Sequence, residues 1–288
     1  MITKQMNSKF NLKNAVLIGL ITITLISLLT MPMVSATTAT PRTWIVDNTF
    51  RGDFTSIQQA VNAASSGDTI LIRPGYYFEN VNVNKPLTIQ SKTGPRDTIV
   101  VALNSNDHVF EIMSDGVAIN GLGIEGAWGW GTSGIFTNAN YGIISNNEVF
   151  DNQYGVHISN ARNNTIANNF VSDNRFGIYL SNSNSNVLTN NNAVDNWNAG
   201  ISIERSNANS IIGNNASDND RGIILTNSNN NVISTNNCVE NVMGIFLLSS
   251  NNNEVTHNML IRNRFAGLDI VNSVNNIVFG NTIISGWI

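Results

Sequence analysis

Hydrophobic and polar positions recur along the chain from Gly134 onward with a period of 21 to 23 residues. A glycine marks each repeat, and an aliphatic residue follows it directly. The marker glycines are Gly134, Gly155, Gly177, Gly200, Gly222, Gly244 and Gly267. A fixed period of this length is typical of solenoids, in which each repeat forms one coil that stacks on the next. The fold is therefore predicted from the repeat rather than from local propensity.

Each repeat contains three short apolar clusters, at one to three, eleven and sixteen residues after the glycine. Alternating apolar and polar residues predict strands, and the Asn, Ser, Asp and Gly between the clusters are typical of turns. Three strands per coil, each paired with its counterpart in the next coil, give parallel sheets with coils roughly 4.8 Å apart. The pattern predicts an all-β fold, a right-handed parallel β-helix of about ten coils and roughly 22 residues per coil.

Asparagine fills three further columns of the repeat, for example at Asn186, Asn191 and Asn196. Asparagine tolerates the left-handed conformation that sharp corners need, and stacked amides can hydrogen-bond from coil to coil. The alternative is an Asn-rich disordered tract. Disorder gives no reason for apolar residues to keep their register, so an ordered stack with asparagines at its corners is predicted.

Residues 1–36 have the pattern of a secretory signal peptide. Lysines at positions 4, 9 and 13 precede an apolar run over 15–31, and Val34-Ser35-Ala36 is a small-residue cleavage sequence. Cleavage is expected after Ala36. The alternative is that this segment is not cleaved and anchors the protein in the membrane. No other membrane attachment is expected. The sequence predicts a secreted or cell-surface protein (periplasmic where the host has a periplasm) with one β-helix domain at 37–288.

Residues 43–100 are expected to form N-terminal capping coils. Thr55 with Gln58 has the spacing of a capping box, and an apolar stripe follows at helical spacing at Ile57, Ala60 and Val61. A short helix here would cover the open backbone of the first coil. Strands are expected at 69–72, 81–83 and 87–89. An irregular coil with a Trp- and Gly-rich loop follows over 101–133, and the regular repeats occupy 134–288.

The segment Phe54–Ile89, FTSIQQAVNAASSGDTILIRPGYYFENVNVNKPLTI, resembles the N-terminal part of secreted β-helix proteins of the pectin-lyase-like class. The repeats resemble the NosD-like family, also called the carbohydrate-binding and sugar-hydrolysis β-helix domain. Together the two resemblances cover nearly all of the mature chain. They imply the fold but not one function, because relatives include polysaccharide lyases, esterases, epimerases, binding proteins and a copper-enzyme accessory protein.

One polar column, eighteen residues after the marker glycine, is acidic. It consists of Asp151, Asp173, Asp195, Asp218 and Glu240, and Arg262 follows them. Stacked carboxylates are untenable in a core, so this column is expected on an exposed corner. Neighbouring carboxylates would repel by roughly 0.8 kcal/mol per pair in water, unless Arg175, Arg221 or Arg264 or a bound Ca²⁺ counters them. The column is interpreted either as simple Asx turns or as a Ca²⁺ site.

Aromatic residues accompany the acidic column at Tyr154, Phe176, Trp197 and Phe265. With Arg221 they suit stacking on sugar rings and bonding to sugar hydroxyls; the alternative is that they only cover the corner. Trp128 and Trp130, in the glycine-rich segment 126–131, form a second candidate contact region.

No complete catalytic motif is found. The chain has no Gly-x-Ser-x-Gly sequence, no counterpart of the paired aspartates and glutamines of pectin methylesterases, and only a partial echo of the epimerase motif at Tyr154–His157. Because a lyase needs little more than a carboxylate-held Ca²⁺ and a base, Asp173 or Asp195 with Arg175 is the catalytic candidate.

Copper is not expected as a cofactor, and Ca²⁺ is the one ion considered. The histidines are His108, His157 and His257, and the last two fall four coils apart, roughly 19 Å at the strand spacing. They cannot share an ion. The single cysteine, Cys238, falls in a core column, so no disulfide framework is expected.

Charge argues against a nucleic-acid partner, since the net charge is −4 and only 12% of residues are charged. Asn163 and Asn215 begin N-glycosylation sequons. The next marker glycine would fall just beyond Ile288, so the last coil is expected to associate end to end with another copy or to continue into a further segment, unless Trp287 folds over it.

The sequence thus favours a β-helix that binds a glycan or polysaccharide along its elongated face without catalysis. Three alternatives stay open: a lyase or epimerase acting on uronic-acid polymers, a structural surface-coat protein, and an accessory protein of copper-enzyme maturation.

Overall fold

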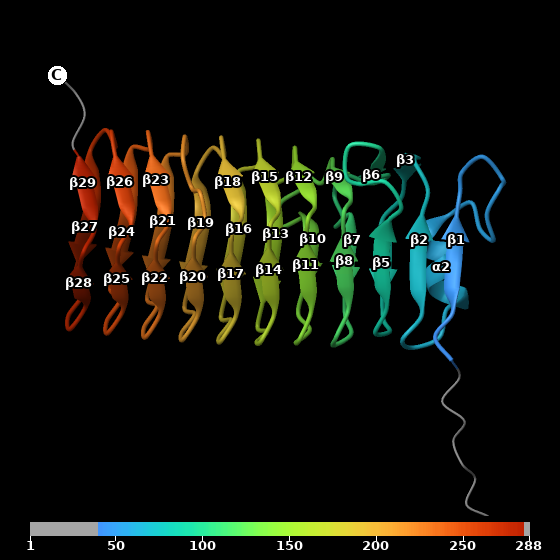
Figure 1. The fold of residues 1–288 in the computed structure, drawn as a ribbon, viewed down its shortest axis with the longest axis horizontal. Coiled ribbons are helices and arrows are strands. Elements are labelled where there is room, and N and C mark those ends of the chain that lie inside the picture. Colours follow the sequence, from blue (N-terminus) through green and yellow to red (C-terminus); the bar gives the residue numbers. More distant parts are fainter. Residues whose placement is uncertain (1–39, 285–288) are drawn as a thin grey trace, which may run out of the picture. The chain divides into compact units, whose positions relative to one another are not determined.

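The computed structural model describes residues 40–284, which form a stack of coils with three strands in each regular turn (Figure 1). The expected signal peptide over 1–36 and Trp287 lie outside the described residues. All strand pairs are parallel. Sheet A has eleven strands, so the stack is one turn longer than the ten coils expected. The predicted all-β, right-handed parallel β-helix is confirmed.

Sheet A contains β1 (Thr43–Val46), β2 (Thr69–Ile72), β5 (Thr88–Ser91), β8 (Ala118–Asn120), β11 (Ile143–Ser145), β14 (Thr165–Ala167), β17 (Val187–Thr189), β20 (Ser210–Ile212), β22 (Val232–Ser234), β25 (Glu254–Thr256) and β28 (Ile277–Phe279). Sheet C contains β4 (Val81–Val83), β7 (Phe110–Ile112), β10 (Ser133–Thr137), β13 (Tyr154–Ser159), β16 (Phe176–Ser181), β19 (Ala199–Glu204), β21 (Arg221–Thr226), β24 (Met243–Leu248) and β27 (Ala266–Val271).

Sheet B has two parts that isolated bridges at Asn215 connect. The first contains β3 (Gly75–Phe78), β6 (Thr98–Val101), β9 (Gly123–Glu125), β12 (Glu148–Phe150), β15 (Phe170–Ser172) and β18 (Asn192–Val194). The second contains β23 (Asn237–Val239), β26 (Met259–Ile261) and β29 (Thr282–Ile284).

Like residues lie over one another inside the stack, as the repeat predicts. Ile178, Ile201 and Ile223 are successive partners in sheet C, and all three are fully buried. Cys238 is buried in the same core with a free thiol, whose pKa burial raises. The marker glycines are required by close approach: a Cβ on Gly200 would lie 2.7 Å from the carbonyl oxygen of Ala193.

The asparagine columns form buried hydrogen-bond ladders, which confirms the predicted amide stacking. Asn191 is typical: its Nδ2 donates to the Ile166 carbonyl at 2.8 Å and to Asn214 Oδ1 in the next coil at 3.0 Å. A fourth ladder, not foreseen, uses serine, and the backbone N–H of Ser183 donates to Ser206 Oγ at 2.8 Å. Each ladder satisfies backbone groups that the turns would otherwise leave unpaired in the interior.

The expected backbone conformation of the ladder asparagines is wrong. Every ladder asparagine has a negative φ, and the residue directly before it adopts the left-handed conformation, as at Asn163 (58°), Asn190 (53°) and Asp195 (55°). The left-handed residue turns the chain sharply, so that the next side chain points inward. The ladder position therefore needs an amide, and the position before it needs only tolerance of positive φ.

The first coil is covered by helix α2 (Ile57–Ala63), which packs against β1, β2 and β4 through Ile57, Ala60 and Val61. The predicted capping box of Thr55 with Gln58 is wrong, because the N-cap is Ser56, whose Oγ accepts from the N–H of Gln59 at 3.3 Å. The Glu79 carboxylate, from the β3–β4 turn, also accepts from the N–H groups of Ile57 and Gln58. Within residues 40–284 no helix is long enough to span a membrane.

Candidate functional site

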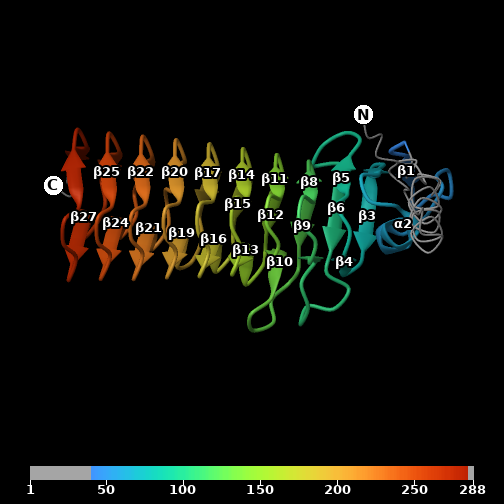
Figure 2. The ribbon, with the colours of Figure 1, turned by 90° about the horizontal axis from the view of Figure 1, so that it is seen from below.

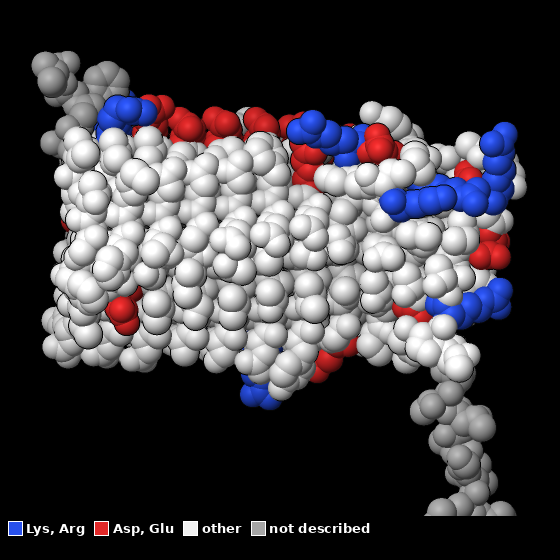
Figure 3. Space-filling model, viewed as in Figure 1, with Lys and Arg blue, Asp and Glu red and all other residues white. Residues whose placement is uncertain are grey.

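The acidic column lies at the exposed corner between sheets B and C, as predicted. Its members all have left-handed φ values, between 53° at Asp151 and 59° at Asp218, and all are exposed. A buried ladder asparagine follows each of them. Figure 3 shows these side chains as a line of red along the upper edge of the stack, above a face with few charged residues. We call Asp151, Asp173, Asp195, Asp218 and Glu240 the acidic row.

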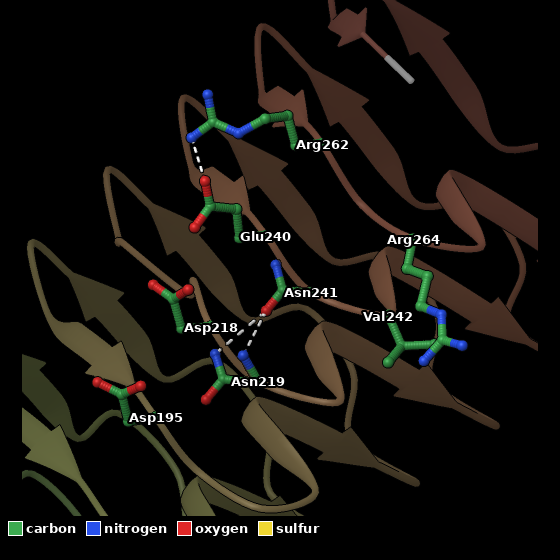
Figure 4. A pocket seen from close by; sticks show the side chains of 8 residues that line it. All are labelled: Asp195, Asp218, Asn219, Glu240, Asn241, Val242, Arg262 and Arg264. Carbon is green, nitrogen blue, oxygen red and sulfur yellow. Dashed lines mark hydrogen bonds and ion pairs between the residues drawn. The ribbon is translucent and has the colours of Figure 1, made fainter. Parts of the chain in front are cut away.

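The C-terminal part of the acidic row borders an open hollow of about 620 Å³ (Figure 4). The hollow is lined by Asp195, Asp218, Asn219, Glu240, Asn241, Val242, Arg262 and Arg264. Arg262 forms an ion pair with Glu240. Partial burial, and then the charges of Asp195 and Glu240, raise the pKa of the Asp218 carboxyl. The C-terminal part of the row is therefore a set of interacting carboxylates with Arg262 paired at its end and Arg264 nearby.

An aromatic cluster covers the outer face of sheet C beside the N-terminal part of the acidic row. Tyr154 and Phe176 are register partners whose rings stack at 5.3 Å. The Tyr179 ring stacks on the Tyr154 ring at 5.1 Å. His157 is the register partner of Tyr179, and the rings of these two residues lie 4.9 Å apart. Phe136 in the preceding coil contacts His157 at 5.3 Å. Alternation from the buried residue after each marker glycine places Phe136, His157 and Tyr179 on the outer face, and the ring contacts of Tyr154 and Phe176 bring these two to the same face.

Three tryptophans adjoin this cluster. Trp128 and Trp130 belong to the loop between β9 and β10, which projects from one side of the stack in Figure 2. The Trp128 ring lies 5.6 Å from that of Trp197, and the guanidinium of Arg175 lies 5.2 Å from the Trp130 ring. Trp130 and Trp197 are 89% and 71% exposed. Their ring faces are thus accessible beside the half-buried cluster.

Burial and hydrogen bonds determine the protonation states of Tyr179 and His157 in the aromatic cluster. The Tyr179 hydroxyl donates to the Glu204 carboxylate, which pairs with Arg205 at 2.9 Å. Burial and this carboxylate raise the pKa of Tyr179. Burial lowers the pKa of His157 to about 4, so its imidazole is neutral at neutral pH. His157 Nε2 lies 3.0 Å from Ser181 Oγ.

Buried polar atoms without a hydrogen-bond partner gather at this part of the protein. Within residues 40–284 they include Ser133 Oγ, Gln153 Nε2, and the Nδ1 atoms of His108 and His157. Ser133 is the register partner of Tyr154, Gln153 precedes Tyr154, and the His108 ring stacks on Phe136 at 4.4 Å. Native proteins pair nearly all such groups, so a concentration of exceptions indicates a place where a polar ligand or ordered water binds.

The structure brings together most of the residues singled out from the sequence. Trp128, Trp130, Tyr154, Phe176 and Trp197 surround one area, with Arg175 among them. Phe265 stands apart in a C-terminal coil, and is 72% exposed. Arg221 pairs with Asp220 at 2.6 Å. Within the described residues no hydrogen bond or ion pair joins Arg175 to Asp173 or Asp195.

Sequence reasoning missed Phe136, His157, Tyr179 and Glu204 as parts of the surface. The signal was present for the first three, because each stands two residues after a marker glycine, where alternation points the side chain outward. Alternation points Glu204 outward as well, but its contact with Tyr179, which crosses from one coil to the next, gave no signal in the sequence.

The three histidines pack against aromatic rings. The ring of Phe136 contacts both His108 and His157, and His257 packs on Phe279. Within residues 40–284 no three His, Cys, Asp or Glu side chains are grouped as metal ligands. The absence of copper and the presence of Ca²⁺ both stay predictions.

Solved structures with a similar fold include polysaccharide-active proteins. An alginate lyase from Paenibacillus sp. is 17% identical with a TM-score of 0.60, over 85% of this chain and 98% of its own. A pectate lyase is 14% identical with a TM-score of 0.60, over 84% and 80%. Tailspike protein 2 of an Escherichia coli O157:H7 bacteriophage is 15% identical with a TM-score of 0.65, over 75% and 34%. At these identities the likeness shows the fold alone.

Two further comparisons concern the sequence. A cell surface glycoprotein of Methanothermus fervidus is 33% identical over 103 residues, which are 35% of this chain; the chain covers only 16% of that protein's length. Residues 61–276 match the family described as periplasmic copper-binding protein (NosD). Because this match covers well over half of the sequence, the chain belongs to the NosD family.

Proposed function

We propose that the chain binds a glycan at the aromatic cluster and its flanking tryptophans, without catalysis, as an exported protein. The observation that carries the proposal is the continuous patch formed by Tyr154, Phe176 and Tyr179 beside the exposed rings of Trp130 and Trp197. Sugar rings present C–H faces that pack on aromatic rings, and hydroxyls that need hydrogen-bond partners.

The unpartnered polar atoms support the same ligand class. Gln153 Nε2 can donate, Ser133 Oγ can donate and accept, and His157 Nδ1 has no bond within the described residues. Hydroxyl groups of a bound sugar would satisfy donors and acceptors alike. An apolar ligand would leave them unpaired, at a cost of about 1–3 kcal/mol for each group.

An exported location is supported by three observations of different kinds. The N-terminal sequence has the pattern of a signal peptide. The family description names a periplasmic protein, and the relative from Methanothermus fervidus is a cell surface glycoprotein. Glycans are abundant in these compartments.

A screen of immobilised glycans followed by titration of the best ligand tests the proposal. Tyr154→Ala and Phe176→Ala should each weaken binding about tenfold, because each removes a stacking surface. Tyr76→Ala is the matched control, since Tyr76 is 58% exposed on β3, outside the cluster. Equal affinities of the three variants and the unchanged protein would contradict the proposal.

A polysaccharide lyase or epimerase is the second candidate, favoured by a neutral imidazole at His157 beside the Tyr179 phenol, with Arg175 over the ring of Phe176 in the same cluster. A neutral imidazole can accept a proton from a sugar carbon, and a cation can stabilise the resulting charge. Unsaturated or epimerised products from uronic-acid polymers, lost in His157→Gln, Arg175→Ala and Asp173→Ala, would establish it.

A further inference from the structure

We infer that the glycan bound by this protein is positively charged: a polymer containing free amino sugars rather than uronic acids. The inference rests on the proposed function and adds the charge class of the ligand.

The corner conformation does not explain why this row is acidic. Three other rows of residues in the stack also have left-handed φ values. They contain Asn, Ser, Arg, Ala, Thr, His and Gly in various coils: Asn160, Asn182, Arg205, Asn227, Ser249 and Asn272; Asn163, Ser185, Ala208, Asn230, Asn252 and Asn275; Asn146, Asn168, Asn190, Gly213, Thr235, His257 and Gly280. None of these residues is a carboxylate. Asparagine would serve the turn equally well, so the corner alone does not require five successive acids.

The acidic row also works against the stability of the stack. Its carboxylates recur at the coil spacing of roughly 4.8 Å, and like charges at this distance repel one another. Partial burial, and then this repulsion, raise the pKa of the Asp218 carboxyl. Residues that break a local rule without a structural benefit are expected mainly at functional positions.

The acidic row is close enough to act on a ligand at the aromatic cluster. Asp151 precedes Tyr154 by three residues, Asp173 precedes Phe176 by three, and Asp195 precedes Trp197 by two. Three residues span at most about 11 Å. A sugar stacked on these rings therefore lies within roughly a Debye length of several carboxylates.

The neighbouring cations offset only part of this field, because most of them are already paired with carboxylates. Arg221 pairs with Asp220, Arg205 with Glu204, and Arg262 with Glu240. Two guanidiniums keep their charge, because neither forms an ion pair within the described residues: Arg175, which lies over the rings of Trp130 and Phe176, and Arg264, at the hollow. Asp151, Asp173 and Asp195 form no ion pair within the described residues. The unpaired aspartates Asp151, Asp173, Asp195 and Asp218 therefore outnumber Arg175 and Arg264, so the surface presents net negative charge to its ligand and a uronate would be repelled.

An independent observation supports a polar ligand at the same place. Gln153 is only 7% exposed, its Nε2 has no hydrogen-bond partner within residues 40–284, and it lies between the acidic row and Tyr154 in the chain. Beyond Trp197, the hollow lined by Asp195, Asp218 and Glu240 continues the acidic surface along the stack (Figure 4). An extended polymer can therefore follow the row over several coils.

Titration of the full chain with three oligosaccharides of equal length tests the charge class: glucosamine, N-acetylglucosamine and galacturonate oligomers, at a pH at which the free amine is protonated. The glucosamine oligomer should bind at least about tenfold more tightly than the galacturonate oligomer, and added salt should reduce the difference. Asp173→Asn with Asp195→Asn should weaken binding of the glucosamine oligomer about tenfold, with less than about a twofold effect on the neutral oligomer.

Asparagine is suited to the left-handed positions, so the double variant should keep the fold. The control, Asp97→Asn with Asp269→Asn, removes the same charge from an N-terminal and a C-terminal coil and should leave all three affinities unchanged. Equal or tighter binding of the galacturonate oligomer, with or without Ca²⁺, would overturn the inference, as would failure of all three probes to bind. If Tyr154→Ala does not affect binding of any glycan, the proposed function fails; if it does but charge has no effect, only this inference fails.

Discussion

The regular repeats and the N-terminal coils solve the same problem, the pairing of backbone groups at the turns, in different ways. In the repeats one amide serves every coil: Asn196 Nδ2 donates to the carbonyls of Val171 and Val194 and to Asn219 Oδ1. In the N-terminal coils each turn has its own partner. Asp68, for example, accepts from the N–H groups of Arg42 and Ser65 and from Trp44 Nε1.

This difference shows what repetition can and cannot provide. A ladder works only where identical coils lie above and below, because each amide needs an equivalent amide as its partner. The first coil has no coil before it and uses charged side chains instead: Glu79 caps the start of α2, and Lys85 Nζ donates to the carbonyls of Val61, Asn62 and Ala64 at its end. The two regions should therefore respond differently to substitution.

The largest effect is expected in a ladder. Asn196→Ala removes three donated bonds and leaves buried carbonyls and the N–H of Asn174 unpaired. The free energy of unfolding should fall by about 3–5 kcal/mol, measured by urea denaturation. Asp195→Asn, one residue earlier, is the control and should change it by less than about 0.5 kcal/mol. Similar effects of the two changes would remove the distinction between ladder and corner.

A smaller loss is expected in the N-terminal coils. Glu79→Ala removes the acceptor of Ser56 Oγ and of the Ile57 and Gln58 N–H groups. Since one helix end is affected, the cost should be about 2–3 kcal/mol. Hydrogen exchange should show faster exchange in α2 while the ladders around Asn196 stay protected. Glu111→Ala, on the outer face of β7, serves as control. If Glu79→Ala reduced protection equally in α2 and in the ladders around Asn196, the two regions would not be stabilised independently.

A pH effect of about 2 kcal/mol is expected from His157, which lies on the non-repeating outer face. Its pKa is about 4 in the fold and 6.5 ordinarily, so between these values the unfolded chain binds more protons. Stability is therefore complete above about pH 6.5 and decreases as the pH falls toward 4, by about 2 kcal/mol at pH 5. His157→Gln should reduce this loss of stability, measured by urea denaturation at about pH 6.5 and at about pH 5. An unchanged pH dependence would show that the imidazole is not buried in this way.

The smallest effect concerns the acidic row and has the opposite sign. Asp218→Asn removes repulsion with Asp195 and Glu240 and should raise the free energy of unfolding by about 0.5 kcal/mol or less at neutral pH and low salt. High salt should abolish the gain, and Asp97→Asn should show none. A loss of stability on this change would mean that the carboxylate has a structural role at the corner.

The sequence by itself determined the coil, its register and its ladders. Ile178, Ile201 and Ile223 recur at a fixed spacing, and equivalent residues of a solenoid must lie over one another because only stacking buries them. The position of the acidic row outside the core followed from the cost of burying charge. The resemblance to NosD-like β-helices agreed with this, and the family match confirmed it.

Only the tertiary structure decided what happens where the repeat is broken. It assigned the cap of α2 to Ser56 and Glu79 instead of Thr55, and the left-handed conformation to the residue before each ladder asparagine. It also brought Trp128 to Trp197, and Tyr179 to Glu204. The physical reason is that a period fixes which residues stack, whereas contacts between unlike side chains on the outer face depend on loop paths and side-chain packing, which no period encodes.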